Sequence, residues 1–337
     1  MNYIKMAPLT GFAGFGGGSS GLTVAGGAPG TGIWYGDRGI FCAGVTSGGT
    51  YYDTIEYFDF ENLGNTTDFG NLVASFRDVA CASDGTKALF CGGKSKPHNT
   101  RENFITWVTT ASTGNATDRG DLAMGGSEGP TGHGNGEHAL IAGGIDASTN
   151  KLNNVDIVVI GTTGNATDFG DLSIASYIGY GAGDLTRCLI ALGATGGSPD
   201  GSNNIDYFTY ASAGNATDFG DLQSIKMDGG GCSDQTRSLF GGGWKFEGGN
   251  QPATVEIDYV ATQTTGNASG FGDLSQARAN GVGGCSSGSK AAWGGGYTGS
   301  GFTDRMDYVT IASTGNASDF GNLVNSRHSV EGTSGGA

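Results

Sequence analysis

Short stretches in which hydrophobic and polar residues alternate recur along most of the chain, and glycine-rich turns separate them. The unit from Gln223 to Leu274 contains four such stretches: QSIKMDGGGCS, TRSLFGGG, VEIDYVATQT and NASGFGDL. Each has the length and alternation of a β-strand, and none has the period of an amphipathic helix. The pattern therefore predicts an all-β protein in which each unit is a meander of four antiparallel strands.

The unit repeats with a nearly fixed period of about fifty residues, which is typical of one blade of a β-propeller. A nine-residue phrase, GNATDFGDL in two copies, begins at Gly64, Gly114, Gly164, Gly214, Gly266 and Gly315. The second-strand segment also occurs six times, at Arg38–Gly44, Lys87–Gly93, Glu137–Gly144, Arg187–Gly193, Arg237–Gly243 and Ser289–Gly296. We therefore predict a six-bladed β-propeller over residues 33–337.

The two ends of the repeat region predict how the ring closes. The first strand of each blade follows the phrase leucine of the preceding unit. No phrase precedes the first blade, so this blade has no first strand of its own. The missing copy follows Leu323 as VNSRHSVEGTSGGA, and Arg327 stands four residues after Leu323 as Arg278 does after Leu274. We predict that this C-terminal strand completes the N-terminal blade, which removes free sheet edges. The alternative is an open solenoid with a frayed tail.

Residues 1–32 lie outside the repeats and have a different composition. They are apolar, carry Lys5 as their only charge, and contain the glycine and proline that oppose a helix. We predict an extended docking arm that orders on a partner. The alternatives are a disordered leader and a plug that binds across the ring itself. The residues expected to dock are Ile4, Met6, Leu9, Phe12, Phe15 and Leu22.

Composition narrows the classes of partner. The net charge is −15 and no basic patch is visible, which argues against nucleic-acid binding. No apolar run reaches the roughly 18 residues of a membrane span, and the opening lacks the apolar region of a secretory signal. The six cysteines form no CxxC pair, and two repeat positions account for five of them: one is assigned to Cys81, Cys232 and Cys285, the other to Cys42 and Cys91. We expect buried thiols in a reducing compartment rather than disulfides or metal ligands.

The phrase concentrates carboxylates. Calcium binding needs six to eight oxygen ligands, whereas Asn and Asp in turns commonly bond nearby backbone N–H groups. Recurrence in every unit favours the structural role, and calcium remains the alternative. No catalytic motif or metal spacing can be assembled around the four histidines, so we expect no enzyme activity and no cofactor. The acids at the fifth position of the phrase are Asp68, Asp118, Asp168, Asp218 and Asp319.

The segments between second and third strands vary most among the units. Those of blades five, six and one, which adjoin in a closed ring, are rich in aromatic residues. We predict that these rings form one exposed arc for sugar or protein contacts. The alternative is that they fold over the blade cores. The residues concerned are Tyr51, Tyr52, Trp244, Phe246, Tyr297 and Phe302.

Two resemblances accompany these patterns. A glycine-ended second strand with an aromatic residue in the third resembles the kelch repeat, although the kelch tryptophan of the fourth strand is replaced by phenylalanine, as at Phe219. Units such as IDYFTYASAGNATDFGDL and MDYVTIASTGNASDFGNL, over about residues 33–337, resemble propeller repeats in virion proteins of tailed phages, above all marine and cyanobacterial ones. The opening MAPLTGFAGFGGG is similar to the leader of such proteins.

The phage resemblance implies a non-enzymatic virion component, present in several copies per particle and assembled in the host cytoplasm. We expect a tail or tail-fibre protein whose arm docks to other virion proteins and whose exposed face contacts a host-surface glycan or a protein. Nucleic-acid binding and membrane insertion are not expected. The alternatives are a capsid-decoration or vertex protein, a free carbohydrate-binding lectin and a propeller hydrolase.

Overall fold

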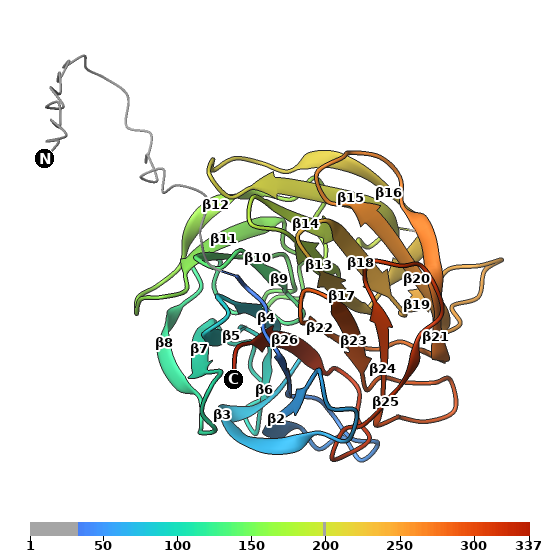
Figure 1. The fold of residues 1–337 in the computed structure, drawn as a ribbon. Helices are drawn as coiled ribbons and strands as arrows, with labels where there is room; N and C mark the ends of the chain where they lie inside the picture. The colour runs from blue at the N-terminus through green and yellow to red at the C-terminus, as the bar shows by residue number, and fades with distance from the viewer. Residues whose placement is uncertain (1–32, 198–199) are drawn as a thin grey trace, which may run out of the picture.

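The computed structural model describes residues 33–197 and 200–337, and six antiparallel sheets are arranged around a central axis within them (Figure 1). The predicted kelch-like architecture of six four-stranded blades is confirmed, because each sheet contains an antiparallel meander of four strands, to which two of the sheets add a short fifth strand. The predicted arm, with Ile4, Met6, Leu9, Phe12, Phe15 and Leu22, lies outside the described residues.

The blades are numbered in chain order, and their strands are given from the axis outward. Blade one contains β26 (Glu331–Gly335), β1 (Arg38–Cys42), β2 (Tyr52–Asp59) and β3 (Thr67–Arg77). Blade two contains β4 (Ala80–Ser83), β5 (Lys87–Cys91), β7 (Phe104–Thr109) and β8 (Thr117–Asp121). Blade three contains β9 (Thr131–Gly134), β10 (His138–Ala142), β11 (Asn154–Val159) and β12 (Thr167–Asp171).

Blade four contains β13 (Tyr180–Gly183), β14 (Arg187–Ala191), β15 (Ser202–Thr209) and β16 (Thr217–Met227). Blade five contains β17 (Gly230–Ser233), β18 (Arg237–Gly241), β20 (Thr254–Ala261) and β21 (Ser269–Arg278). Blade six contains β22 (Gly283–Ser286), β23 (Lys290–Gly294), β24 (Arg305–Thr310) and β25 (Ser318–Asn322). Two short strands, β6 (Lys94–Lys96) and β19 (Trp244–Lys245), extend the preceding blade by pairing with β3 and β16.

The ring closes as the sequence predicts. β26 pairs antiparallel with β1, from Arg38 opposite Gly335 to Cys42 opposite Glu331. The C-terminus also contacts blade two, because the Gly336 N–H donates to the Gly85 carbonyl at 2.7 Å. The first blade is thus built from both ends of the described chain, and its inner sheet edge is covered.

The innermost strands line the axis and are rich in glycine. A Cβ on Gly181 would lie 2.1 Å from the Gly132 carbonyl oxygen, and one on Gly231 would lie 2.1 Å from that of Gly181. Neighbouring inner strands therefore approach so closely that these positions exclude a side chain.

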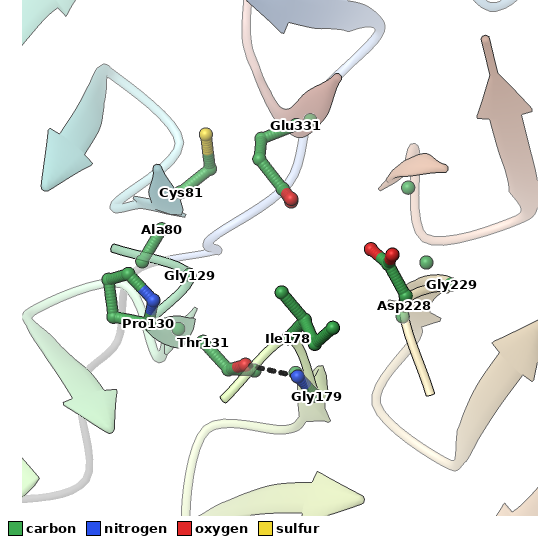
Figure 2. A pocket seen from close by; sticks show the side chains of 16 residues that line it. Ala80, Cys81, Gly129, Pro130, Thr131, Ile178, Gly179, Asp228, Gly229 and Glu331 are labelled. Carbon is green, nitrogen blue, oxygen red and sulfur yellow. Dashed lines mark hydrogen bonds between the residues drawn. The ribbon is translucent and has the colours of Figure 1, made fainter. Parts of the chain in front are cut away.

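Each link between blades reaches the axis through a residue with a left-handed backbone. The φ angles are 53° at Asp78, 52° at Ile178 and 67° at Asp228, with Gly129 at 69° between the first two. These residues bond head to tail around the axis: the N–H of Gly129 donates to Asp78 O at 2.8 Å, that of Ile178 to Gly129 O at 2.8 Å, and that of Asp228 to Ile178 O at 2.9 Å. Positive φ is unusual for a β-branched residue such as Ile178, so the link is held by its neighbours rather than by local preference. Figure 2 shows this mouth of the axis.

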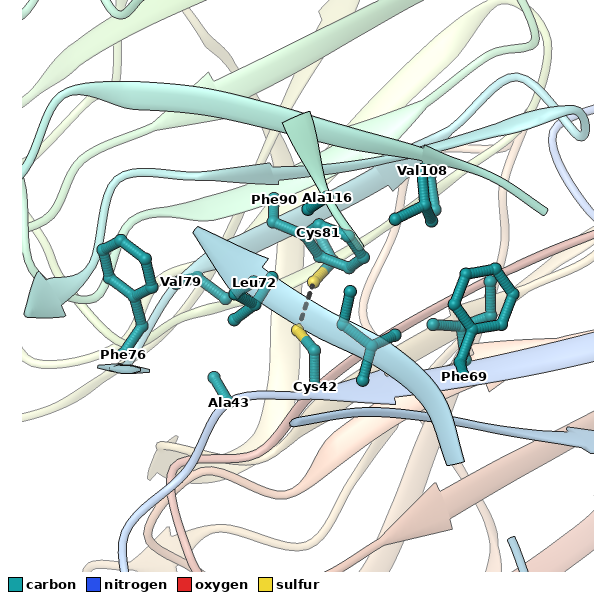
Figure 3. Close-up of a cluster of buried hydrophobic side chains, with 13 residues drawn as sticks. Cys42, Ala43, Phe69, Leu72, Phe76, Val79, Cys81, Phe90, Val108 and Ala116 are labelled. Carbon is teal, nitrogen blue, oxygen red and sulfur yellow. Dashed lines mark hydrogen bonds between the residues drawn. The ribbon is translucent and has the colours of Figure 1, made fainter. Parts of the chain in front are cut away.

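Apolar side chains fill the spaces between adjacent blades. Between blades one and two, Phe69, Phe76 and Phe90 belong to one apolar cluster with Cys42 and Cys81, whose sulfur atoms are 3.7 Å apart (Figure 3). All six cysteines are free and buried, in agreement with the packing role expected of them. One assigned equivalence is wrong: Cys81 pairs with Phe90, whereas Cys232 pairs with Leu239, so the two cysteines occupy adjacent strand positions.

The phrase fastens each blade to the next. The Asn165 side-chain oxygen accepts a hydrogen bond from the Asp121 N–H of the preceding blade at 3.1 Å. All six copies do the same, and the copy at Asn65 binds Asn322 N–H at 3.1 Å across the closure. These asparagines therefore bind the neighbouring blade. The other four acceptors are Asn115, Asn215, Asn267 and Asn316.

A second set of contacts between blades is buried and centres on an acidic position of the third strand. Glu56, Asp258 and Asp307 are at most 1% exposed, and each pairs with a cation from the preceding blade's outer strand or the link after it. The pairs are Arg327–Glu56, Lys226–Asp258 and Arg278–Asp307. The corresponding Asp156 and Asp206 instead accept hydrogen bonds from backbone N–H groups of the link.

Candidate functional site

One face of the ring carries the loops between second and third strands together with the links between blades. We call it the loop face. Each loop forms a short antiparallel pairing with the link of the preceding blade, as Lys94 does with Arg77 and Tyr297 with Ala279. Because this backbone pairing is the same in each blade, the blades differ on the loop face mainly in the side chains that they carry there.

Three blades contribute a row of touching aromatic rings to this face. The ring centroids of Trp244 and Tyr297 are 5.8 Å apart, and those of Tyr297 and Phe302 are 5.6 Å apart. The His328 ring follows 4.5 Å from Phe302. All four side chains are partly exposed.

The row continues to Tyr51 through Val45. Val45 N–H donates to the His328 carbonyl at 2.8 Å, and Val45 also pairs with Tyr51 on its other side. Directly paired residues of antiparallel strands project to the same side, so His328 and Tyr51 share a surface. We call Trp244, Tyr297, Phe302, His328 and Tyr51 the aromatic arc.

The other two aromatic residues of the predicted face lie outside this arc. The Tyr52 ring stacks on the guanidinium of the buried Arg327, 5.4 Å from its centroid. Phe246 turns toward blade four, where its N–H donates to the Ile225 carbonyl at 3.0 Å. The sequence did not single out His328 for this face; its position in the last link, equivalent to Arg77 in the first, is the signal that would have found it.

Beyond Tyr51 the surface becomes basic. The Tyr51 ring lies 5.5 Å from the Arg77 guanidinium carbon and 5.3 Å from Lys96 Nζ. Together with Lys94 and Arg101 these cations form what we call the basic corner.

The carboxylates of this region pair with three of the four cations of the basic corner. Glu128 pairs with Arg77, with Arg101 at 2.9 Å and with Lys94 at 3.8 Å, and Asp78 lies 3.4 Å from Arg77. Glu102 accepts a hydrogen bond from Ser95. Within the described chain, Lys96 forms no ion pair and is exposed. Lys96 is thus the cation of the corner that remains available to an anion.

Carboxyl groups also gather at the axis on the loop face. Figure 2 shows Asp228 and Glu331 pointing into the narrow mouth lined by the first residues of the inner strands. Burial raises the pKa of Asp228 to about 8, and the negative charge of Asp78 adds to this effect. Burial likewise raises the pKa values of Asp78 and Glu331. These groups therefore keep protons more readily than ordinary carboxyls do.

The residues described here contain no group of three histidine, cysteine, aspartate or glutamate side chains arranged to hold a metal ion. The phrase acids Asp68, Asp118, Asp168, Asp218 and Asp319 are exposed on the outer strands. Their spacing around the ring places one acid on each of five blades.

The opposite end of the axis is closed by Trp34. Its side chain is 5% exposed, and its ring meets that of His133 edge-on at 5.4 Å. Inner-strand residues such as Ser83 and Ser233 line the same space. Burial lowers the pKa of His133 to about 4, and its Nδ1 lies 2.9 Å from the Tyr210 hydroxyl. The described chain thus begins at the axis, on the face opposite the aromatic arc.

Comparisons with known proteins add no assignment: no protein-family model matches the chain, and no curated protein matches it. Across residues 33–197 and 200–337, no helix is long and apolar enough to cross a membrane.

Proposed function

We propose that this protein is a non-enzymatic structural component of a phage virion, in the tail or a tail fibre, that is anchored on one face and binds with the other. The observation that carries the proposal is that the start of the described chain and the aromatic arc lie on opposite faces of the ring. Ile33 and Trp34 lie on the face opposite the aromatic arc. A ring tethered through residues 1–32 would therefore direct the arc away from the particle.

The resemblance of the repeats to phage virion propellers supports the same assignment. Closure of the first blade by the last strand also suits a particle component, because it leaves no inner edge for uncontrolled pairing. In this proposal residues 1–32 dock to other virion proteins, several copies are present per particle, and assembly takes place in the host cytoplasm. A capsid-decoration or vertex position places the same two faces in the same roles.

The test is to purify the source particle, quantify the chain by mass spectrometry and trace its density by cryo-electron microscopy. We expect stoichiometric copies with the Trp34 face toward the particle. A phage lacking residues 1–22 of this chain should assemble particles that lack the ring. Particles without the chain, or incorporation that is independent of residues 1–22, would contradict the proposal.

A free carbohydrate-binding lectin is the second candidate, and the aromatic arc favours it. Partly exposed rings with polar edges are suited to sugars whether or not the ring is attached to a particle. The particle measurement separates the two: a lectin of this kind would be found in the soluble lysate and not in purified virions.

A further inference from the structure

We infer that the loop face binds an acidic oligosaccharide, with sugar rings stacked along the aromatic arc and an acidic substituent held at the basic corner. The inference deepens the proposed function and rests on it for the source of the ligand, a glycan of the host surface.

The first step of the argument is continuity. The arc passes from Trp244 through Tyr297 and Phe302 to His328 with ring separations of 5.8, 5.6 and 4.5 Å. It then reaches Tyr51 through the paired Val45. Such a path spans blades five, six and one, and is suited to an extended chain of rings rather than to a single small molecule.

The second step is the polarity around the rings. The Thr298 and Ser300 hydroxyls lie 3.2 Å apart beside Tyr297, whose own hydroxyl donates to the Gly299 carbonyl at 2.8 Å. On the other side, the Asn280 amide lies 3.0 Å from His328 Nδ1. A sugar presents an apolar C–H face and a hydroxyl rim, and this surface offers a partner to each.

The third step is charge. The protein has a net charge of −15, so an anionic ligand is repelled by most of its surface. The loop KSKPHNTR, residues 94–101, carries Lys94, Lys96 and Arg101 and no carboxylate. Its exposed Lys96 lies 5.3 Å from the Tyr51 ring, at the end of the arc. At the other end of the arc, Lys245 is already paired with Glu256 and Glu247. A carboxylate, sulfate or phosphate on the ligand is therefore favoured at the Lys96 end, which also fixes the direction of binding.

The test uses the full-length chain, fluorescently labelled, on a glycan array that displays uronate, sialylated and sulfated oligosaccharides beside neutral counterparts of equal length. We expect binding to acidic members only, weakened by 0.5 M NaCl because screening acts on exposed charges. Trp244→Ala and Lys96→Glu should each weaken binding about tenfold or more.

The controls are matched substitutions on the opposite face. Tyr35→Ala removes a partly exposed ring. Lys290→Glu makes the same charge change as Lys96→Glu but also removes contacts with Glu61 and the Phe60 carbonyl, so its folding is checked by a thermal melt. Both should bind like the wild type. Lys96 is exposed, so its substitution reports on binding even if Trp244→Ala does not fold, which a thermal melt will show.

Equal binding to neutral glycans, an unchanged affinity in Lys96→Glu, or binding to none of the displayed glycans would overturn the inference. These outcomes are independent of whether the chain is found in purified particles. A ring that is stoichiometric in virions but binds no glycan would refute the ligand and leave the proposed function standing. Glycan binding by a chain absent from particles would refute the virion assignment and establish the lectin.

Discussion

Buried ion pairs join neighbouring blades, and the loss of either partner leaves the other charge buried without a counter-ion. Arg327 and Glu56 are both fully buried, and Glu56 also accepts hydrogen bonds from Thr66 and the Val324 N–H. Compared with apolar side chains of similar volume, a buried ion pair adds little to the free energy of unfolding. Removal of one partner is costly, because the other charge stays buried without a counter-ion.

Arg327→Met should lower the free energy of unfolding by about 3–5 kcal/mol, because it leaves the Glu56 carboxylate unpaired at the closing junction. Denaturant titration will measure the loss. Arg305→Met is the matched control: Arg305 is 38% exposed in its pairing with Asp307, and its loss should cost less than about 1 kcal/mol. Equal effects of the two substitutions would contradict this interpretation.

The raised pKa values of the carboxyls at the axis predict an unusual dependence of stability on pH. Since the pKa of Asp228 is raised to about 8, the folded chain keeps a proton at this site that the unfolded chain loses near pH 4. Burial lowers the pKa values of His133 and His328 to about 4, which has the opposite effect on stability below about pH 6.5. Stability should therefore fall as the pH rises from about 6.5 to about 8. Asp228→Asn should flatten that decline and raise the melting temperature at pH 8.5. A wild-type melting temperature that is constant from pH 6 to pH 8.5 would show that the site does not retain its proton.

At the scale of elements, the repeated phrase joins outer strands of neighbouring blades. Each asparagine oxygen satisfies a backbone N–H of the preceding blade, and the phrase glycine approaches the same strand closely: the Gly214 N–H donates to the Phe169 carbonyl at 2.8 Å. The phrase repeats because each of the six junctions needs the same contact.

Asn215→Ala should destabilise the protein by about 1 kcal/mol, because the Asp171 N–H loses its acceptor. Thermal and chemical denaturation will measure the change. Asn250→Ala is the control, since Asn250 is exposed in the β19–β20 loop and only its backbone is hydrogen-bonded. If the two substitutions cost the same, the phrase asparagine contributes no specific contact between blades.

At the scale of the whole molecule, closure by β26 converts a row of blades into a ring. Deletion of residues 331–337 removes the partner of β1 and exposes its edge. We expect a fall in melting temperature and concentration-dependent association, measured by calorimetry and by light scattering after size exclusion, because a free edge pairs with other chains. Deletion of Ala337 alone should change neither. A monomeric truncated chain with an unchanged melting temperature would show that the closing strand is dispensable.

The sequence by itself determined the architecture: blade number, strand order and closure all follow from its repeat. The reason is that each blade is a local meander whose strands lie within about fifty residues, so alternation and turn chemistry specify it without knowledge of distant contacts. It also placed Trp244, Tyr297, Phe302 and Tyr51 on neighbouring loops, because adjacency of blades follows from ring closure.

The tertiary structure alone decided which side chains meet across blades. His328 completes the arc, Lys96 lies beside Tyr51, and Trp34 closes the far end of the axis. Strand periodicity indicates which side of its own sheet a residue occupies, but not which residue of another blade faces it. The shared positive φ of the links likewise depends on the head-to-tail bonding around the axis. These contacts join side chains of different blades or links, so they form only when the blades pack together.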